Sequence, residues 1–112
     1  MGQKPKRTAW GCILKSIITP DLEHCIFCGK PAEKHHCFGA SNRHLSTKDG
    51  LILPLCPEHH RDGANAVHRN ADMALLVHMV GELSWIRVNA LPFEDYESAK
   101  DRFRKRYGKN YL

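Results

Sequence analysis

Side chains that could bind metal ions are concentrated in the middle of this chain. The 112 residues include 5 cysteines and 8 histidines, and most of both types lie within 25–69. Cys25 and Cys28 are separated by two residues, and so are Cys56 and His59. Thiolates and imidazoles are the ligands of closed, four-coordinate structural Zn²⁺ sites. The spacing therefore predicts a structural zinc site made of these four residues.

Local turn and helix signals support that site. Gly29 allows the chain to turn between the first two ligands. If Pro57 begins a helix, the second pair of ligands lies on one helical face. An odd number of cysteines leaves no complete disulfide framework, although buried cysteines with a chance spacing are the alternative. Cys12 and Cys37 lack ligand spacing and are interpreted as small buried residues.

The remaining histidines include two adjacent pairs, His35-His36 and His59-His60. Neighbours on a strand point to opposite faces, and neighbours on a helix point about 100° apart. Each pair can therefore divide between two tasks. If the helix packs on the strand, His60 comes close to His35 or His36. This predicts a second, histidine-rich site beside the zinc site.

These motifs together resemble the zinc-containing HNH (His-Me finger, ββα-metal) endonucleases, and in particular small phage-encoded members similar to recombination-enhancing nucleases. The resemblance covers 25–69 and implies a small α+β fold, in which a zinc-stapled, treble-clef-like ββα-metal core has flanking helices. The motifs that carry it are Cys25-x2-Cys28, His35-His36 and Leu53-Pro54-Leu55-Cys56-Pro57-Glu58-His59-His60.

The resemblance also implies roles for individual histidines. His35 corresponds to a ligand of the catalytic metal, His36 to the general base and His60 to a second metal ligand. A further ligand often follows four residues after the last of these, but Ala64 stands there. His68 is the nearest substitute, and a surface histidine is the alternative interpretation.

The asparagine of the family motif is a second departure. Leu51 stands where the family often has it, five residues before Cys56. Asn42 is the available replacement as a catalytic residue, but it could equally be a simple turn residue.

These residue types suit phosphodiester hydrolysis. A histidine is largely neutral at pH 7 and can accept a proton from water, while a divalent ion polarises the phosphate. Imidazole ligands suit Ni²⁺, Zn²⁺, Co²⁺ or Mn²⁺ better than Mg²⁺, which prefers oxygen. The resemblance implies the activity of a metal-dependent DNA endonuclease that leaves 5′-phosphate and 3′-hydroxyl ends. Basic residues near the site that could bind flanking phosphates, or simply be solvated, are Arg43, Lys48, Arg61 and Arg69.

Two other functions stay open, a non-catalytic zinc DNA-binding module and a zinc-stabilised protein adaptor. The net charge of +5 favours an anionic partner such as DNA. A homodimer, or a partner protein in recombination or DNA packaging, is compatible with the sequence. No run of about 18 apolar residues exists, which excludes a membrane span, and no secretory signal is recognisable. The expected location is the cytoplasm, that of a bacterial host if the gene belongs to a phage.

The length fits one domain covering 1–112. Residues 1–8 are polar and basic and are interpreted as an arm, and 9–19 carry apolar residues at helical spacing. Apolar runs at 35–38 and 51–55 predict two short strands.

Two longer helices are predicted in the C-terminal part, at 71–83 after the N-cap Asn70 and at 92–107. Pro92 fits a first helical turn and Gly108 a C-terminal cap. The side chains expected to face the core are Leu75, Leu76, Met79, Val80 and Leu83 in the first helix, and Phe93, Tyr96, Ala99, Phe103 and Tyr107 in the second.

Overall fold

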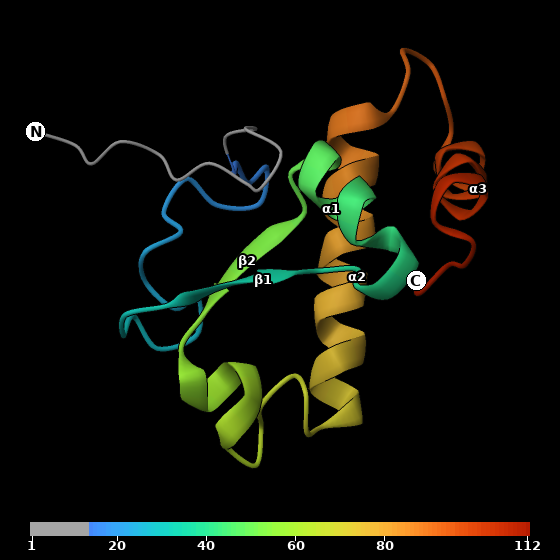
Figure 1. The fold of residues 1–112 in the computed structure, drawn as a ribbon. Coiled ribbons are helices and arrows are strands. Elements are labelled where there is room, and N and C mark those ends of the chain that lie inside the picture. The colour runs from blue at the N-terminus through green and yellow to red at the C-terminus, as the bar shows by residue number, and fades with distance from the viewer. Residues whose placement is uncertain (1–13) are drawn as a thin grey trace, which may run out of the picture.

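The computed structural model describes residues 14–112, which form a small mixed α+β fold as predicted. A two-stranded sheet lies across α2, with α3 beside it (Figure 1). Within residues 14–112, no helix has the length and apolar character needed to cross a membrane. The elements in order are β1 (Glu33–His36), η1 (Ala40–Asn42), α1 (Arg43–Asp49), β2 (Ile52–Leu55), η2 (Glu58–Asp62), α2 (Ala71–Asn89) and α3 (Tyr96–Tyr107).

The sheet is an antiparallel pair in which His35 lies opposite Leu53 and His36 opposite Ile52. All residues of β2 are buried, whereas those of β1 are half-buried. The predicted strand at 35–38 is therefore displaced by two residues, since β1 ends at His36. Cys37 still donates its N–H to the Leu51 carbonyl at 2.9 Å, which carries the pairing just past the strand.

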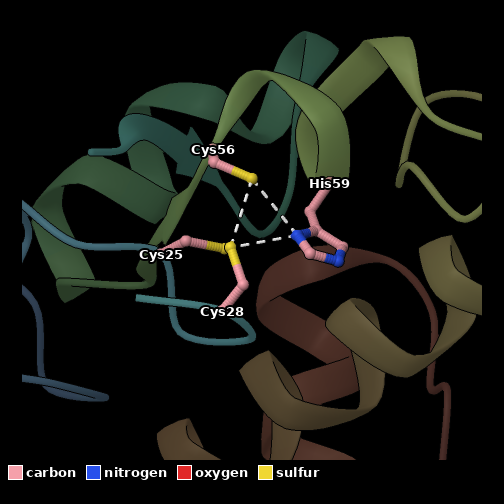
Figure 2. Close-up of side chains that lie close together, drawn as sticks. All are labelled: Cys25, Cys28, Cys56 and His59. Carbon is pink, nitrogen blue, oxygen red and sulfur yellow. Dashed lines mark hydrogen bonds between the residues drawn. The ribbon is translucent and has the colours of Figure 1, made fainter. Parts of the chain in front are cut away.

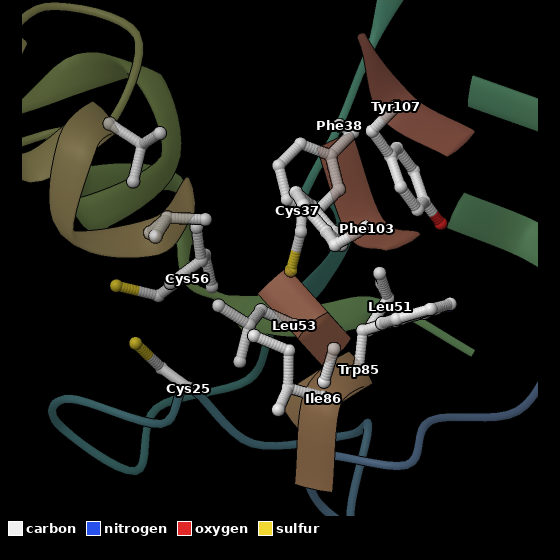
Figure 3. Packing of buried hydrophobic residues seen from close by; sticks show 14 residues of the cluster. Cys25, Cys37, Phe38, Leu51, Leu53, Cys56, Trp85, Ile86, Phe103 and Tyr107 are labelled. Atoms are coloured by element: carbon white, nitrogen blue, oxygen red, sulfur yellow. The ribbon is translucent and has the colours of Figure 1, made fainter. Parts of the chain in front are cut away.

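Aromatic rings fill the core between the sheet and the C-terminal helices (Figure 3). The ring centroid of Tyr107 lies 4.7 Å from that of Phe38 and 4.6 Å from that of Phe103. Cys37 is buried beside them, as predicted, while Cys12 lies outside the described residues. Cys25 and Cys56 border this core, so the predicted zinc ligands are joined to its packing.

The predicted helix at 71–83 exists as α2, but its predicted core face is wrong. Asn70 does cap it, accepting N–H donors from Asp72 and Met73, and the helix continues to Asn89. Its buried positions are instead Val77, Gly81, Glu82, Trp85 and Ile86. Leu75, Leu76 and Leu83 are 45%, 42% and 53% exposed.

Close contact between the backbone of α2 and the Phe38 ring explains which side of the helix faces the core. A Cβ atom at Gly81 would lie only 2.8 Å from a ring carbon of Phe38. The helix therefore packs through its smallest side chain, and its leucine-rich side turns outward.

The predicted helix at 92–107 begins later, at Tyr96, because Asp95 rather than Pro92 is placed to cap it. The Asp95 carboxylate accepts the Ser98 N–H at 2.7 Å, and Pro92 lies in the preceding turn. Phe93 has a φ of 65° and is fully exposed, so its predicted burial is wrong, and Tyr96 is exposed as well. Gly108 ends the helix with a φ of 90°, as expected of a C-terminal cap.

The predicted helix at 9–19 is wrong for the described part, 14–19, which is irregular, and the remainder lies outside the described residues, as does the arm at 1–8. The Ser16 hydroxyl accepts the N–H of Ile18 and donates to the Ile52 carbonyl at 2.7 Å. Ile17 donates its N–H to the Gly50 carbonyl at 2.9 Å. These bonds attach the segment to the start of β2, and a serine side chain that binds the local backbone competes with helix formation.

Candidate metal centre

Cys25, Cys28, Cys56 and His59 converge on one point, as predicted (Figure 2). Their ligand atoms lie within 4.8 Å of one another. The two Sγ atoms of Cys28 and Cys56 are 3.6 Å apart, and His59 Nδ1 lies 3.2 Å from Cys56 Sγ and 3.6 Å from Cys25 Sγ. A tetrahedral ion with the bond lengths of zinc would hold such atoms about 3.6–3.8 Å apart. The group can therefore hold a metal ion.

Short-range hydrogen bonds shape the first half of this four-ligand group. Gly29 has a φ of 78°, which confirms its predicted role in the turn. Its N–H donates to the Cys25 carbonyl at 2.9 Å, and Ile26 donates to the Pro54 carbonyl of β2 at 3.0 Å. The turn is thus attached directly to the strand that precedes the second pair of ligands.

The electrostatic surroundings favour thiolate at Cys25. Burial raises the pKa of this thiol, but backbone N–H groups of Cys56 and Phe27 outweigh burial and lower the pKa to about 6. Since the thiolate is the form that binds metal, Cys25 is ready for coordination at neutral pH.

The structure brings three further histidines together beside this group. Ring nitrogens of His35, His60 and His68 lie within 4.8 Å of one another, and we call these residues the histidine cluster. His35 Nδ1 is 3.3 Å from His60 Nε2. Burial, followed by the neighbouring charges of His60 and His68, lowers the pKa of His35 to about 4. His35 is therefore neutral at pH 7 and has a lone pair available.

A backbone turn places His68 in the histidine cluster. Val67 donates its N–H to the His59 carbonyl at 2.8 Å, and His68 donates to the His60 carbonyl at 3.0 Å. The chain can reverse because of Gly63, where a Cβ would lie 2.7 Å from the Glu58 carbonyl oxygen. His59 thus belongs to the four-ligand group and His60 to the histidine cluster, and the carbonyls of both residues accept hydrogen bonds from the returning chain.

Glu33 is a site residue that the sequence analysis missed. Its carboxylate accepts a hydrogen bond from His60 Nδ1 at 2.9 Å and two from Arg61 Nη1 at 2.8 Å. The hydrogen bonds from His60, and then from Arg61, lower the pKa of this carboxyl. The bond assigns the proton to His60 Nδ1 and leaves Nε2 to face His35. Glu33 and His35 share one face of β1, and this period-two spacing is the signal that could have identified Glu33.

His36 points to the other face of β1 and contacts α1. Its Nε2 lies 2.8 Å from the Thr47 hydroxyl, which itself donates to the Arg43 carbonyl at 3.2 Å. Thr47 therefore accepts the His36 Nε2–H, and His36 Nδ1 is left unprotonated. Burial, and then the charge of Arg43, lowers the pKa of His36, so the neutral ring dominates at pH 7.

Asn42 and the basic residues have varied surroundings. The Asn42 amide donates to the Tyr107 carbonyl at 3.0 Å, so it attaches η1 to the end of α3. Arg69 donates to the Asp62 carbonyl at 2.7 Å, and Arg61 is paired with Glu33. Arg43 and Lys48 are exposed on α1. None of these contacts tests the predicted roles in catalysis or phosphate binding.

Three histidines to which no functional role was assigned lie outside both groups. His24 and His44 are exposed, and His24 Nδ1 lies 2.9 Å from an Asp21 oxygen. His78 is half-buried and stacks on Phe38 at the edge of the core, with ring centroids 5.4 Å apart.

Comparison with protein-family models, curated proteins and solved structures finds no match for this chain.

Proposed function

We propose that this protein is a metal-dependent DNA endonuclease of the HNH type, with a ββα-metal core, a structural zinc ion and a second, catalytic divalent ion. The observation that carries the proposal is the position of the histidine cluster. Its member His60 follows His59 of the four-ligand group on η2, and its member His35 precedes His36 on β1. A structural zinc site requires only the four-ligand group. The histidine cluster and the unprotonated Nδ1 of His36 are additional groups, and they suit a catalytic function.

The histidine cluster fits a divalent ion on its own geometry. A tetrahedral ion holds two nitrogen ligands about 3.3–3.4 Å apart, and His35 Nδ1 and His60 Nε2 are 3.3 Å apart. The hydrogen bond from His60 to Glu33 is the kind of outer contact that orients metal-ligating histidines. A divalent ion held there by His35, His60 and His68 would polarise the scissile phosphate and stabilise the departing 3′ oxygen.

His36 supplies the base in this proposal. Its unprotonated Nδ1 takes a proton from the attacking water as the new bond to phosphorus forms and the bond to the 3′ oxygen breaks. Thr47 holds the ring by accepting the Nε2–H, and so preserves the tautomer that the step requires.

A plasmid-nicking assay tests the proposal. Supercoiled plasmid is incubated with zinc-loaded protein and Mg²⁺, Mn²⁺, Ni²⁺ or Co²⁺, and the His36→Ala and His60→Ala variants are assayed beside it. Nicking by the native protein that both variants lose is expected, with loss of about 10²–10⁴-fold in rate for the missing base. His44→Ala, which changes an exposed histidine outside both groups, is the matched control and should keep full activity.

Full nicking by His36→Ala would move the base elsewhere. Salt-dependent DNA binding without cleavage by any of these ions would instead favour the non-catalytic binding module.

A further inference from the structure

The outward face of α2 is an apolar surface that the described chain leaves open. Leu75, Leu76 and Leu83 are about half exposed, and Met79 and Val80 are partly exposed between them. One acidic and one basic residue lie at the two ends of this surface. We define the outward face as Asp72, Leu75, Leu76, Met79, Val80, Leu83 and Arg87.

Apart from Leu75, whose counterpart would be Ser84, the spacing of these residues is symmetric about the midpoint between Met79 and Val80. Leu76 and Leu83 are equally far from that point, and so are Asp72 and Arg87. At about 100° per residue, all six positions fall within an arc of about 100° on the helix. At symmetric positions, the apolar side chains are therefore similar in size and the two end residues are opposite in charge.

Such a face is complementary to a second copy of itself. If two α2 helices pair antiparallel about a two-fold axis at the midpoint, Leu76 lies opposite the partner's Leu83 and Met79 opposite the partner's Val80. Asp72 then lies opposite the partner's Arg87, and the symmetry creates this ion pair twice. A parallel, in-register pair would instead place like charges together, so charge selects the antiparallel arrangement.

Both charged groups are available for these contacts. Among residues 14–112, Asp72 has no ion-pair partner. Arg87 uses one Nη2 donor for the Ile17 carbonyl at 3.2 Å, and the rest of its guanidinium can still bind a carboxylate.

We propose that the occupant of this face is a second copy of this chain, paired through α2 in an antiparallel homodimer. The 16 residues from Asp72 to Arg87 span about 24 Å of helix, which makes a small contact by the standards of permanent dimers. We therefore expect the association to be reversible.

Sedimentation equilibrium of the full chain tests this, with Zn²⁺ limited to one ion per chain so that excess metal cannot bridge surface histidines. The native protein should show a monomer–dimer equilibrium. Asp72→Lys and Arg87→Glu should each raise the dissociation constant at least about tenfold, because each creates two like-charge contacts. The double variant Asp72→Lys/Arg87→Glu should restore dimerisation, since it exchanges the two charges.

Substitutions at two apolar positions of α2 supply a second test and its control. Leu83→Glu should abolish the dimer, whereas Val88→Glu, at a similarly exposed position on another side of α2, should leave it unchanged. Circular dichroism and zinc content confirm that each variant is folded. A monomer at all concentrations, a dimer unaffected by Leu83→Glu, or failure of the double variant to restore pairing would each overturn the proposal.

Discussion

Glu33 shows how a single residue can organise a site without belonging to its motif. It lies on the same face of β1 as His35, accepts a hydrogen bond from His60 and is paired with Arg61. In this position its carboxylate determines which nitrogen of His60 carries the proton. The histidine cluster therefore depends on an acid that precedes the histidine pair in the sequence.

Replacing Glu33 by glutamine should weaken metal binding at the histidine cluster. A neutral amide is a poorer acceptor for His60 Nδ1–H, and outer-contact substitutions of this kind typically cost about 10–100-fold in metal affinity. Calorimetric titration of zinc-loaded protein with Co²⁺ or Ni²⁺ measures the effect. Glu23→Gln is the control because the Glu23 carboxylate lies 3.8 Å from Lys34 Nζ and belongs to neither ligand group. Equal affinity in the Glu33 and Glu23 variants would contradict the role given to Glu33.

At the scale of single residues, the sequence predicted which four Cys and His side chains come together, but not the contacts that support the histidine cluster. Cys25, Cys28, Cys56 and His59 are recognisable because metal coordination demands particular atoms at short spacings. His68 depends instead on where a turn returns the chain, which the sequence alone left open.

Among the elements, the turn that joins η2 to α2 is the one on which the histidine cluster depends most. Gly63→Ala should strain this turn, since the new Cβ would meet the Glu58 carbonyl at 2.7 Å. We expect a loss of about 1–3 kcal/mol in the free energy of unfolding and weaker Co²⁺ binding at the histidine cluster. Urea unfolding and metal titration measure the two effects. Gly39→Ala, where nothing lies within 4 Å of the added Cβ, should change neither, and equal behaviour of the two variants would refute this account.

Gly81→Ala tests the packing of α2 on the core. Alanine in a helix is intrinsically favoured over glycine by about 1 kcal/mol, but the new Cβ would lie 2.8 Å from the Phe38 ring. Overpacking costs about 1–3 kcal/mol, so the net expectation is destabilisation in urea unfolding. Ser84→Ala, at a half-exposed position of the same helix, should be neutral or stabilising. Stabilisation by Gly81→Ala would show that the helix can move away from the ring.

The same glycine explains why the orientation of α2 was mispredicted. Helical periodicity correctly identified the helix and its cap at Asn70, but α2 has apolar residues on more than one side. The sequence cannot show which side meets a partner, because that depends on the shape of the surface opposite. Glu82 adds to the difficulty: it is fully buried, and its carboxylate accepts hydrogen bonds from Asn110 and the Tyr111 N–H.

For the molecule as a whole, the four-ligand group joins the turn that follows Cys25 to the segment between β2 and η2. Cys25 and Cys56 are part of the core cluster, and a chain of this size has a modest core to stabilise it. The α+β class was predictable from the short strands and long C-terminal helices. The connection between the strands was not, because η1 and α1 occupy it and neither has a strong apolar pattern.

If the four-ligand group holds a structural metal ion, as we propose, removing that ion should unfold the middle of the protein. Cys56→Ser, or a strong chelator, should cause loss of bound zinc and loss of the cooperative thermal transition, because metal binding and folding are coupled. Elemental analysis and circular dichroism measure both. Cys37→Ala is the control, since Cys37 is equally buried but lies outside both ligand groups, and it should keep its zinc. Retention of zinc with unchanged melting in Cys56→Ser would contradict a structural role.

One peptide bond separates His59 from His60, and this adjacency has a consequence for the order of events during maturation. In the proposed two-metal protein, an ion at the four-ligand group would hold η2 in place and so favour the arrangement of the histidine cluster, which makes the second ion easier to bind after the first. The affinity measured for the second ion would therefore be lower when the four-ligand group is empty, because it would include the free-energy cost of ordering η2. Chelation should proceed in reverse order, with a fast release that leaves the fold intact and a slow release that destroys it. When zinc is scarce, unfolded chains would accumulate rather than folded protein that lacks only the second ion.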